Sequence, residues 1–178
     1  MSRDRAIFLT QNAVGGALVL ASYVWGLTSR PDAGGVLWGG VPEALRPVYS
    51  VNMLLAAAGY FAFTPWFLRA SGSPHVRFFG DARFGAVNTL YALVLFPSAL
   101  WLPLTFAMVD APSSALWWTI RLDLLLVGAG AIGLLAALWT TQPRGSRLAH
   151  AAAVVGLLPF CLQTAVLDAL VWPWFYPA

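Results

Sequence analysis

Five long apolar stretches occupy most of this chain of 178 residues. A helix that crosses a hydrocarbon core of about 30 Å needs about 20 predominantly apolar residues. The stretches lie at about Ala6–Leu27, Pro47–Leu68, Phe84–Val109, Ser114–Trp139 and Leu148–Trp172. The composition agrees, since 60% of the residues are hydrophobic and only 10% are charged. The sequence therefore predicts an all-α, multi-pass integral membrane protein, with residues 1–178 forming a single bundle of five transmembrane helices.

The arginines predict how this bundle is oriented. All ten basic residues are Arg, and they are scattered without a run or stripe, which argues against a nucleic-acid partner. The N-terminus and the second and fourth loops carry seven of them, whereas the first loop carries two and the third loop and C-terminus none. Because cytoplasmic loops are enriched in positive charge, we expect a cytoplasmic N-terminus and a C-terminus on the outside.

Several kinds of chemistry are disfavoured by residues that the chain lacks. Without a lysine it cannot form a Schiff base with retinal or pyridoxal phosphate. Its single cysteine, Cys161, cannot form an internal disulfide or a redox pair. Its two histidines, His75 and His150, lie near helix ends rather than as an intramembrane pair for haem. We expect no metal site and no cofactor.

Three charged residues lie inside apolar stretches: Arg121, Asp123 and Asp168. A charge at the centre of a transmembrane helix costs roughly 2.5–3.5 kcal/mol on insertion scales, so such residues usually face a bundle interior, a partner or a water-filled cavity. Arg121 and Asp123 are two residues apart and point in nearly opposite directions on a helix, so they are not a local pair. Arg121 is expected to extend toward the headgroups or to reach Asp168 or Asp110. Asp123 lies deeper and is the residue most in need of a partner, a proton or a ligand.

Other polar and aromatic residues are expected at similar depth in the outer half. Cys161, Thr164 and Asp168 follow helical spacing on the fifth stretch. The first loop, Thr28–Arg46, places Leu37 and Trp38 between two glycine pairs that could act as hinges, so it is either a cover for the bundle or an interfacial anchor. The candidate ligand-binding residues are Arg121, Asp123, Asp168, Asn52, Tyr49, Thr164 and Trp38. The alternative is an Arg–Asp clamp that locks helix packing.

A second polar set lies nearer the cytoplasmic end. For these residues, hydrogen bonding between helices is the expected role. They are Gln11, Asn12, Thr64, Asn88, Tyr91 and His150.

Short motifs add a family resemblance. Five helices in fewer than 180 residues, nine Trp, a long first loop and the local sequences Asn88-Thr-Leu-Tyr91, Pro159-Phe160 and Leu167-Asp168 together resemble the tryptophan-rich sensory protein/translocator protein family (TspO). The chain departs from that family where Tyr91 replaces a Trp and Asp168 an Asn, and where two consecutive prolines are reduced to the separated Pro42 and Pro47. The resemblance implies a five-helix bundle that binds porphyrins, sterols or similar planar hydrophobic ligands beneath the first loop, as a homodimer.

Three classes of function remain open. The first is a membrane receptor or carrier that binds a hydrophobic small molecule, a sterol, isoprenoid, lipid or tetrapyrrole, in a polar recess of the outer half. The second is a small intramembrane enzyme, such as a sterol or isoprenoid isomerase, with Asp123 or Asp168 as acid/base. The third is a non-catalytic subunit of a larger membrane complex. The expected partners are membrane lipids, the hydrophobic ligand, and a second copy or other subunits.

Overall fold

The computed structural model describes residues 2–176, which form helices, loops and two isolated β-bridges. Five helices are each long and apolar enough to cross a membrane, as the sequence predicted, and their ends differ from the predicted ends by at most three residues. The helices, in chain order, are α1 (Arg3–Ser29), α2 (Ala33–Trp38), α3 (Arg46–Ala70), α4 (Phe84–Asp110), α5 (Ser114–Thr140), α6 (Arg147–Cys161), the π-helix η1 (Leu162–Val171) and α7 (Trp172–Phe175).

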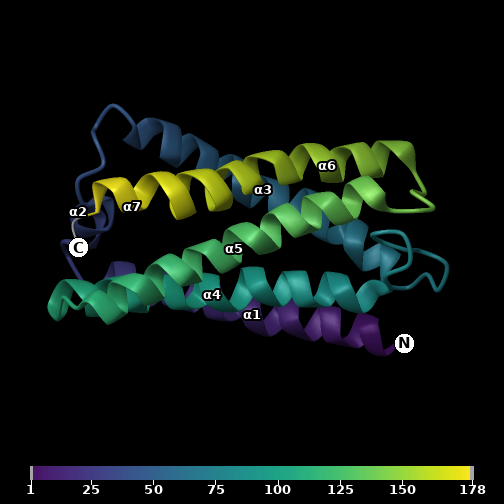
Figure 1. Cartoon of the computed structure of the whole chain (residues 1–178), viewed down its shortest axis with the longest axis horizontal. Helices are drawn as coiled ribbons and strands as arrows, with labels where there is room; N and C mark the ends of the chain where they lie inside the picture. Colours follow the sequence, from purple (N-terminus) through teal and green to yellow (C-terminus); the bar gives the residue numbers. More distant parts are fainter. Residues whose placement is uncertain (1, 177–178) are drawn as a thin grey trace.

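The long helices pack side by side in an order that differs from their order in the chain. α4 packs between α1 and α5, α5 in turn packs against α6 and η1, and α6 packs along α3. α1 and α3, at the two ends of this series, contact each other only weakly. In Figure 1, α5 runs diagonally between a pair formed by α1 and α4 and a pair formed by α3 and α6.

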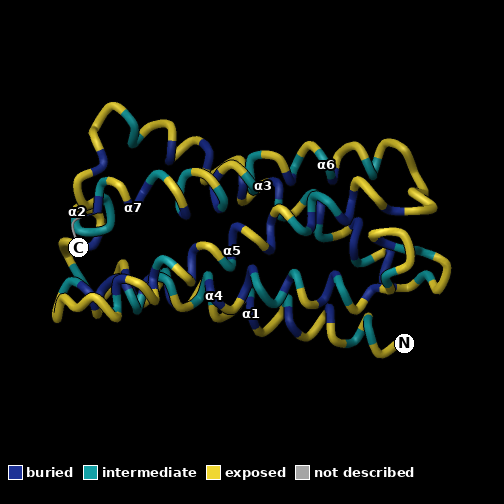
Figure 2. Tube along the Cα trace, in the orientation of Figure 1, coloured by how far each residue is buried: buried dark blue, intermediate teal, exposed yellow. Residues whose placement is uncertain are grey.

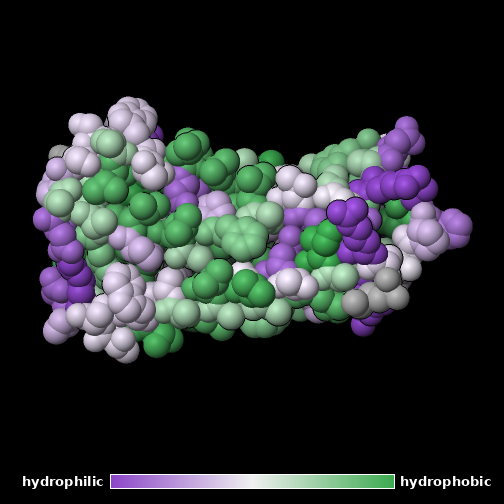
Figure 3. Space-filling model, turned by 90° about the horizontal axis from the view of Figure 1, so that it is seen from below, coloured by the Kyte–Doolittle hydropathy of each residue, from purple (hydrophilic) through white to green (hydrophobic). Residues whose placement is uncertain are grey.

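The outward faces of this bundle are apolar, as its interior is. Buried positions lie on the helix faces that turn toward one another, and many exposed positions on the outward faces are large and apolar (Figure 2). Leu54, Phe61 and Trp139, for example, are at least 70% exposed. Hydrophobic side chains cover most of the middle of the face shown in Figure 3, and hydrophilic ones gather mainly at its two ends. An outward apolar surface of this kind is typical of helices that face lipid.

Glycines allow the closest helix contacts. A Cβ atom added at Gly59 of α3 would collide with the carbonyl oxygen of Gly156 on α6. A Cβ atom at Gly156 would in turn lie 2.9 Å from the Cβ atom of Ala62. Small residues let helix backbones approach in this way, and in a membrane such close packing is a main source of association.

The two ends of the bundle differ in charge. At one end, the Ser2 hydroxyl donates to the Ser71 carbonyl (3.2 Å), and the Arg77 amide donates to the Gln142 carbonyl (2.8 Å), so the N-terminus and two loops meet. We call this the arginine-rich end, because it carries the seven arginines of the N-terminus and these loops. The opposite end, with α2 and α7, is called the distal end (Figure 1).

The fifth membrane-length helix is not a regular α-helix throughout, as the sequence analysis had assumed. α6 continues without a break into η1, a π-helix of 10 residues, and then into α7. Pro159, near the end of α6, has no N–H to donate to the preceding turn. Extended π-helix is rare and widens the turn to i→i+5 hydrogen bonds. The change alters which side chains of this segment share a face.

Candidate functional site

The polar side chains nearer the arginine-rich end bond to one another. Gln11 Nε2 donates to Asn88 Oδ1 (3.3 Å), which joins α1 to α4, and the Tyr60 hydroxyl donates to Asn12 Oδ1 (2.5 Å), which joins α3 to α1. The same group includes bonds from the Tyr91 hydroxyl to Thr64 (3.1 Å) and between His150 Nε2 and the Leu138 carbonyl (2.9 Å). These contacts confirm that this set forms hydrogen bonds between helices.

A second network surrounds Asp168 in the distal half. Gln163 Nε2 donates to Asp168 Oδ1 (2.8 Å), and Asn52 Nδ2 on α3 donates to Gln163 Oε1 (3.0 Å). Asn52 Nδ2 also contacts the Pro159 carbonyl oxygen (3.0 Å). The buried Asn52 side chain is thus bonded to the α6–η1 segment, which ties the two helices together.

The π-helical turn makes the Gln163–Asp168 contact possible. Residues five apart lie about 140° apart around an α-helix, since each residue turns it by about 100°. In a π-helix, position i+5 returns close to position i. Gln163 and Asp168 therefore meet only because η1 departs from α-helical geometry.

A tyrosine of α3 bonds to η1 next to Asp168. The Tyr49 hydroxyl of α3 donates to the Leu167 carbonyl oxygen (2.9 Å) of η1. The Asp168 carboxyl group is near enough to the hydroxyls of both Tyr49 and Tyr23, which lies on α1, to interact with them electrostatically. Side chains from α1, α3 and η1 therefore gather around one carboxyl group.

Arg121 does not reach either carboxylate proposed for it from the sequence. Its guanidinium carbon lies 5.9 Å from the ring centre of Trp117 and 5.6 Å from that of Trp118, on the side of α5 toward the distal end. Asp110 pairs instead with Arg30, and its hydrogen bond with that carboxylate raises the pKa of the Arg30 guanidinium. An Arg121–Asp clamp is therefore wrong for the described residues, because closer partners are available to Asp110 and Asp168.

Asp123 has no partner of its own. Its side chain is 6% exposed, its Oδ2 atom is buried, and no described residue donates a hydrogen bond to that atom. Within residues 2–176, one other buried side-chain atom shares this condition: Nε1 of Trp101. A buried polar atom without a hydrogen bond costs about 1–3 kcal/mol, so natural structures rarely keep one without a reason.

These two unpartnered atoms belong to residues at matching heights on facing helices. A Cβ atom at Gly130 of α5 would lie 2.9 Å from Cγ2 of Val94 on α4. Asp123 lies about two helical turns from Gly130, and Trp101 lies the same distance from Val94, toward the loop that joins the antiparallel helices. Counting along the two helices thus places a buried hydrogen-bond acceptor and a buried donor at about the same height of the α4–α5 pair.

Aromatic rings surround this region. The rings of Trp172 and Tyr176 are stacked with centroids 4.3 Å apart, and Trp172 also packs against Trp117 (6.2 Å) and Trp101 (6.1 Å). Tyr23 of α1 packs against Trp101 (6.3 Å). We call these five residues the distal aromatic cluster. Large rigid rings around a few polar groups are typical of sites for hydrophobic ligands.

The first loop lies against the C-terminal segment. Trp172 Nε1 donates to the Leu37 carbonyl oxygen (2.9 Å), and the Gly40 amide donates to the Phe175 carbonyl oxygen (2.7 Å). Trp38 packs edge-on against Tyr49, with 5.8 Å between ring centres. The loop therefore covers part of the distal aromatic cluster.

The glycines of this loop do not form two equivalent hinges, as the sequence had suggested. Gly34 and Gly35 lie inside α2, where the helix restrains them. Gly39 ends α2 with φ of 53°, a conformation that glycine adopts without strain. The first loop therefore has one glycine with positive φ, directly after Trp38.

The remaining predicted residues contribute less. The Thr164 hydroxyl donates to the Phe160 carbonyl of its own helix (2.9 Å), so its hydrogen is already used. Across residues 2–176, no group of three or more His, Cys, Asp or Glu side chains is placed to hold a metal ion.

The sequence analysis did not identify Gln163 or Trp101 as residues of the site. The amide of Gln163 inside an apolar stretch was a signal of a polar contact in the membrane. α-Helical spacing, however, puts Gln163 and Asp168 on different faces of the helix. Trp101 was interpreted as an interfacial anchor, which its ring alone would suggest.

We compared the chain with protein-family models, curated proteins and solved structures, and none of them matched. The resemblance to the TspO family therefore stays a prediction.

Proposed function

We propose that this protein binds a hydrophobic small molecule with a polar end in the distal half of its bundle, as a membrane receptor or carrier. A sterol, an isoprenoid, another lipid or a tetrapyrrole is the class of ligand that such a site would take. The single observation that carries the proposal is Asp123, a buried carboxyl group whose Oδ2 atom has no partner in the described chain. The resemblance to TspO suggests the same class of ligand.

The polar end of the ligand follows from the two unpartnered atoms. Oδ2 of Asp123 accepts a hydrogen bond when the carboxyl group is ionised, and Nε1 of Trp101 can only donate one. A hydroxyl group both donates and accepts. A ligand hydroxyl would pair with either atom, whereas an apolar ligand would satisfy neither.

The weak contact between α1 and α3 provides a route of entry from the bilayer. α1 is held mainly by α4, and α3 mainly by α6, and the Tyr60–Asn12 hydrogen bond that joins α1 to α3 lies nearer the arginine-rich end, so moving α1 and α3 apart in the distal half breaks few contacts. Tyr23 on α1 and Tyr49 on α3 face the distal half, where ring faces would line the path of an apolar ligand. Entry by this route would leave the hydrogen bonds around Asn52 and Gln163 intact.

Thermal unfolding in detergent, with and without farnesol, cholesterol or protoporphyrin, tests the proposal. At least one of these probes should stabilise the protein, and Asp123→Ala should remove that stabilisation. Trp101→Phe should weaken it about tenfold in apparent Kd, because one hydrogen bond to a polar group is lost. Thr119→Ala, an exposed position on the same helix, serves as the control and should change nothing. Stabilisation that persists unchanged in Asp123→Ala would contradict the proposed site.

The same carboxyl group supports a second candidate, an intramembrane isomerase. An unpaired carboxyl group among apolar side chains can transfer a proton to and from a carbon–carbon double bond. Asp123→Asn preserves the shape but cannot act as the acid or base. Turnover of a sterol or isoprenoid that is lost in Asp123→Asn, while binding is retained, would establish the enzyme; binding without turnover in the unaltered protein would exclude it for that substrate.

A further inference from the structure

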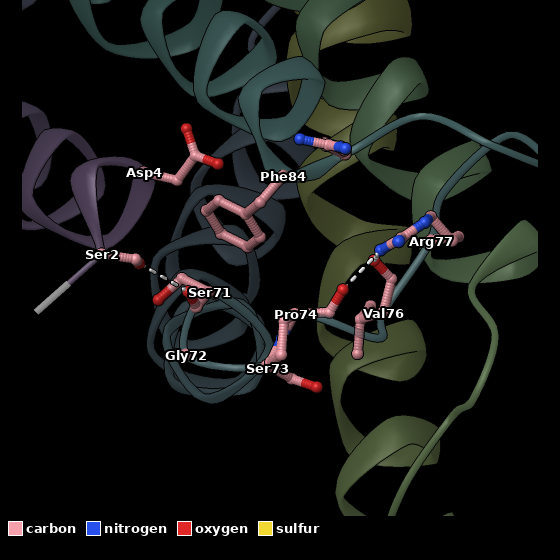
Figure 4. A pocket seen from close by; sticks show the side chains of 10 residues that line it. Ser2, Asp4, Ser71, Gly72, Ser73, Pro74, Val76, Arg77 and Phe84 are labelled. Carbon is pink, nitrogen blue, oxygen red and sulfur yellow. Dashed lines mark hydrogen bonds between the residues drawn. The ribbon is translucent and has the colours of Figure 1, made fainter.

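A cavity of about 420 Å³ lies at the arginine-rich end, far from the distal aromatic cluster. It is formed where the first residues of α1, the loop after α3 and the first residue of α4 come together (Figure 4). Its volume falls within the range of about 300–1,000 Å³ that is usual for small-molecule sites. The residues that line it include Ser2, Asp4, Ser71, Arg77, Arg83 and Phe84.

Two arginines give the cavity its positive charge. Arg77 Nη1 donates to the carbonyl oxygens of Pro74 (2.6 Å) and Val76 (3.0 Å), which holds the guanidinium in place. No hydrogen bond of its Nε and Nη2 groups is found within residues 2–176. Within residues 2–176, Arg83 forms no ion pair. It directly precedes α4, and no side chain caps the N-terminus of that helix. Guanidinium groups and the positive end of a helix both favour a phosphate group.

Asp4 gives the cavity a negative charge at a separate position. Figure 4 shows Asp4 and Arg77 on different sides of the open space, with Phe84 and Pro74 between them. Among the described residues Asp4 forms no salt bridge, so its charge is not neutralised by the arginines. A simple anion would be attracted by Arg77 and Arg83 but repelled by Asp4. A molecule with both charges would use all three residues.

We propose that this cavity binds a phosphate group linked to a primary amine, as in the headgroup of a phosphatidylethanolamine lipid. Arg77 and Arg83 hold the phosphate, and Asp4 accepts hydrogen bonds from the ammonium group. The position suits a lipid, because the cavity lies at the end of membrane-length helices, where the headgroup layer lies. Phe84 and Val76 supply apolar contacts for the glycerol end. The site is independent of the ligand proposed for the distal half.

Native mass spectrometry of the full chain in detergent tests this, with phosphatidylethanolamine, phosphatidylglycerol and phosphatidylcholine added in equal amounts. We expect the unaltered protein to retain phosphatidylethanolamine most. Arg77→Gln and Arg83→Gln should each lower its apparent affinity about tenfold, the loss of roughly one charge-assisted hydrogen bond. Asp4→Asn should weaken phosphatidylethanolamine and not phosphatidylglycerol. The control is Arg144→Gln, because Arg144 lies at the same end, donates to the Trp139 carbonyl (3.1 Å) and does not line the cavity.

Equal retention of the three lipids, or the same loss of binding in Arg144→Gln, would overturn the proposal. Arg83 is exposed, so Arg83→Gln tests the site even where Arg77→Gln disturbs the loop. Soluble glycerophosphoethanolamine distinguishes the source of the phosphate group. Failure to compete at millimolar concentration supports a membrane lipid. Full competition would instead show that a water-soluble phosphate ester binds, and would overturn the lipid assignment.

Discussion

Two carboxyl groups in the same half of this bundle are treated differently by their surroundings. Asp168 receives a hydrogen bond from Gln163, which in turn receives one from Asn52. Asp123 receives none at its buried Oδ2 atom. Because a satisfied polar group stabilises the folded state and an unsatisfied one opposes it, Asp168 helps to hold η1 against α3, whereas Asp123 contributes no such hydrogen bond at Oδ2.

Replacement of Gln163 and Asp123 by leucine should therefore have opposite effects. Gln163→Leu leaves Asn52 and Asp168 without their partner, and should lower the free energy of unfolding by about 1–3 kcal/mol. Asp123→Leu removes an unsatisfied atom, and should leave the unfolding free energy unchanged or raise it. Thermal unfolding in detergent measures both, with the exposed Gln142→Leu as a matched control. Equal destabilisation by the two leucine variants would show that Asp123 has a structural partner.

Helix contacts depend on a few positions where backbones nearly touch. α3 and α6 meet at Gly59 and Gly156, where even a methyl group has no room. The π-helical segment then continues along α3 toward the distal end, where Asn52 and Tyr49 bond to it. A tight crossing at one place and a hydrogen-bonded contact at another thus fix the position of the whole fifth segment.

Gly59→Ala should be much more harmful than the same change at Gly16. A Cβ atom at Gly59 collides with backbone, which cannot move aside as a flexible side chain can, so overpacking should cost about 1–3 kcal/mol. Gly16 lies inside α1 with nothing within 4 Å of an added Cβ atom. Alanine there should be neutral or stabilising by about 0.5–1 kcal/mol, since glycine weakens helices. Chemical or thermal unfolding of both variants in detergent measures the difference, and similar losses would contradict the tight crossing.

The molecule as a whole has an apolar middle and two unlike ends. One end carries seven arginines and the cavity with Asp4, and the other carries α2, the C-terminal residues of the described chain and the Arg30–Asp110 ion pair. Membrane proteins retain positively charged ends in the cytoplasm. We therefore propose that the arginine-rich end faces the cytoplasm and that the distal site opens toward the outer leaflet.

Single cysteines introduced into a Cys161→Ala background test this orientation. His75 at the arginine-rich end and Glu43 at the distal end are both exposed. In intact cells, a membrane-impermeant thiol reagent should label Glu43→Cys at once, and His75→Cys only after the membrane is permeabilised. Labelling of His75→Cys in intact cells would reverse the orientation, and with it the leaflet proposed for each site.

The length and apolar character of five stretches were enough to predict the helical elements, because burial in lipid depends on composition over about 20 residues. The same local reasoning identified Asp123 as a charge in need of a partner, and predicted that Gln11 and Asn88 bond between helices. The identity of the partners was decided only by tertiary structure. Gln163 reaches Asp168 through a π-helical turn, and the packing of α4 on α5 brings Trp101 and Asp123 to about the same height of the bundle. Both depend on which helices become neighbours and on how each is wound, and neither follows from the spacing of residues in one segment.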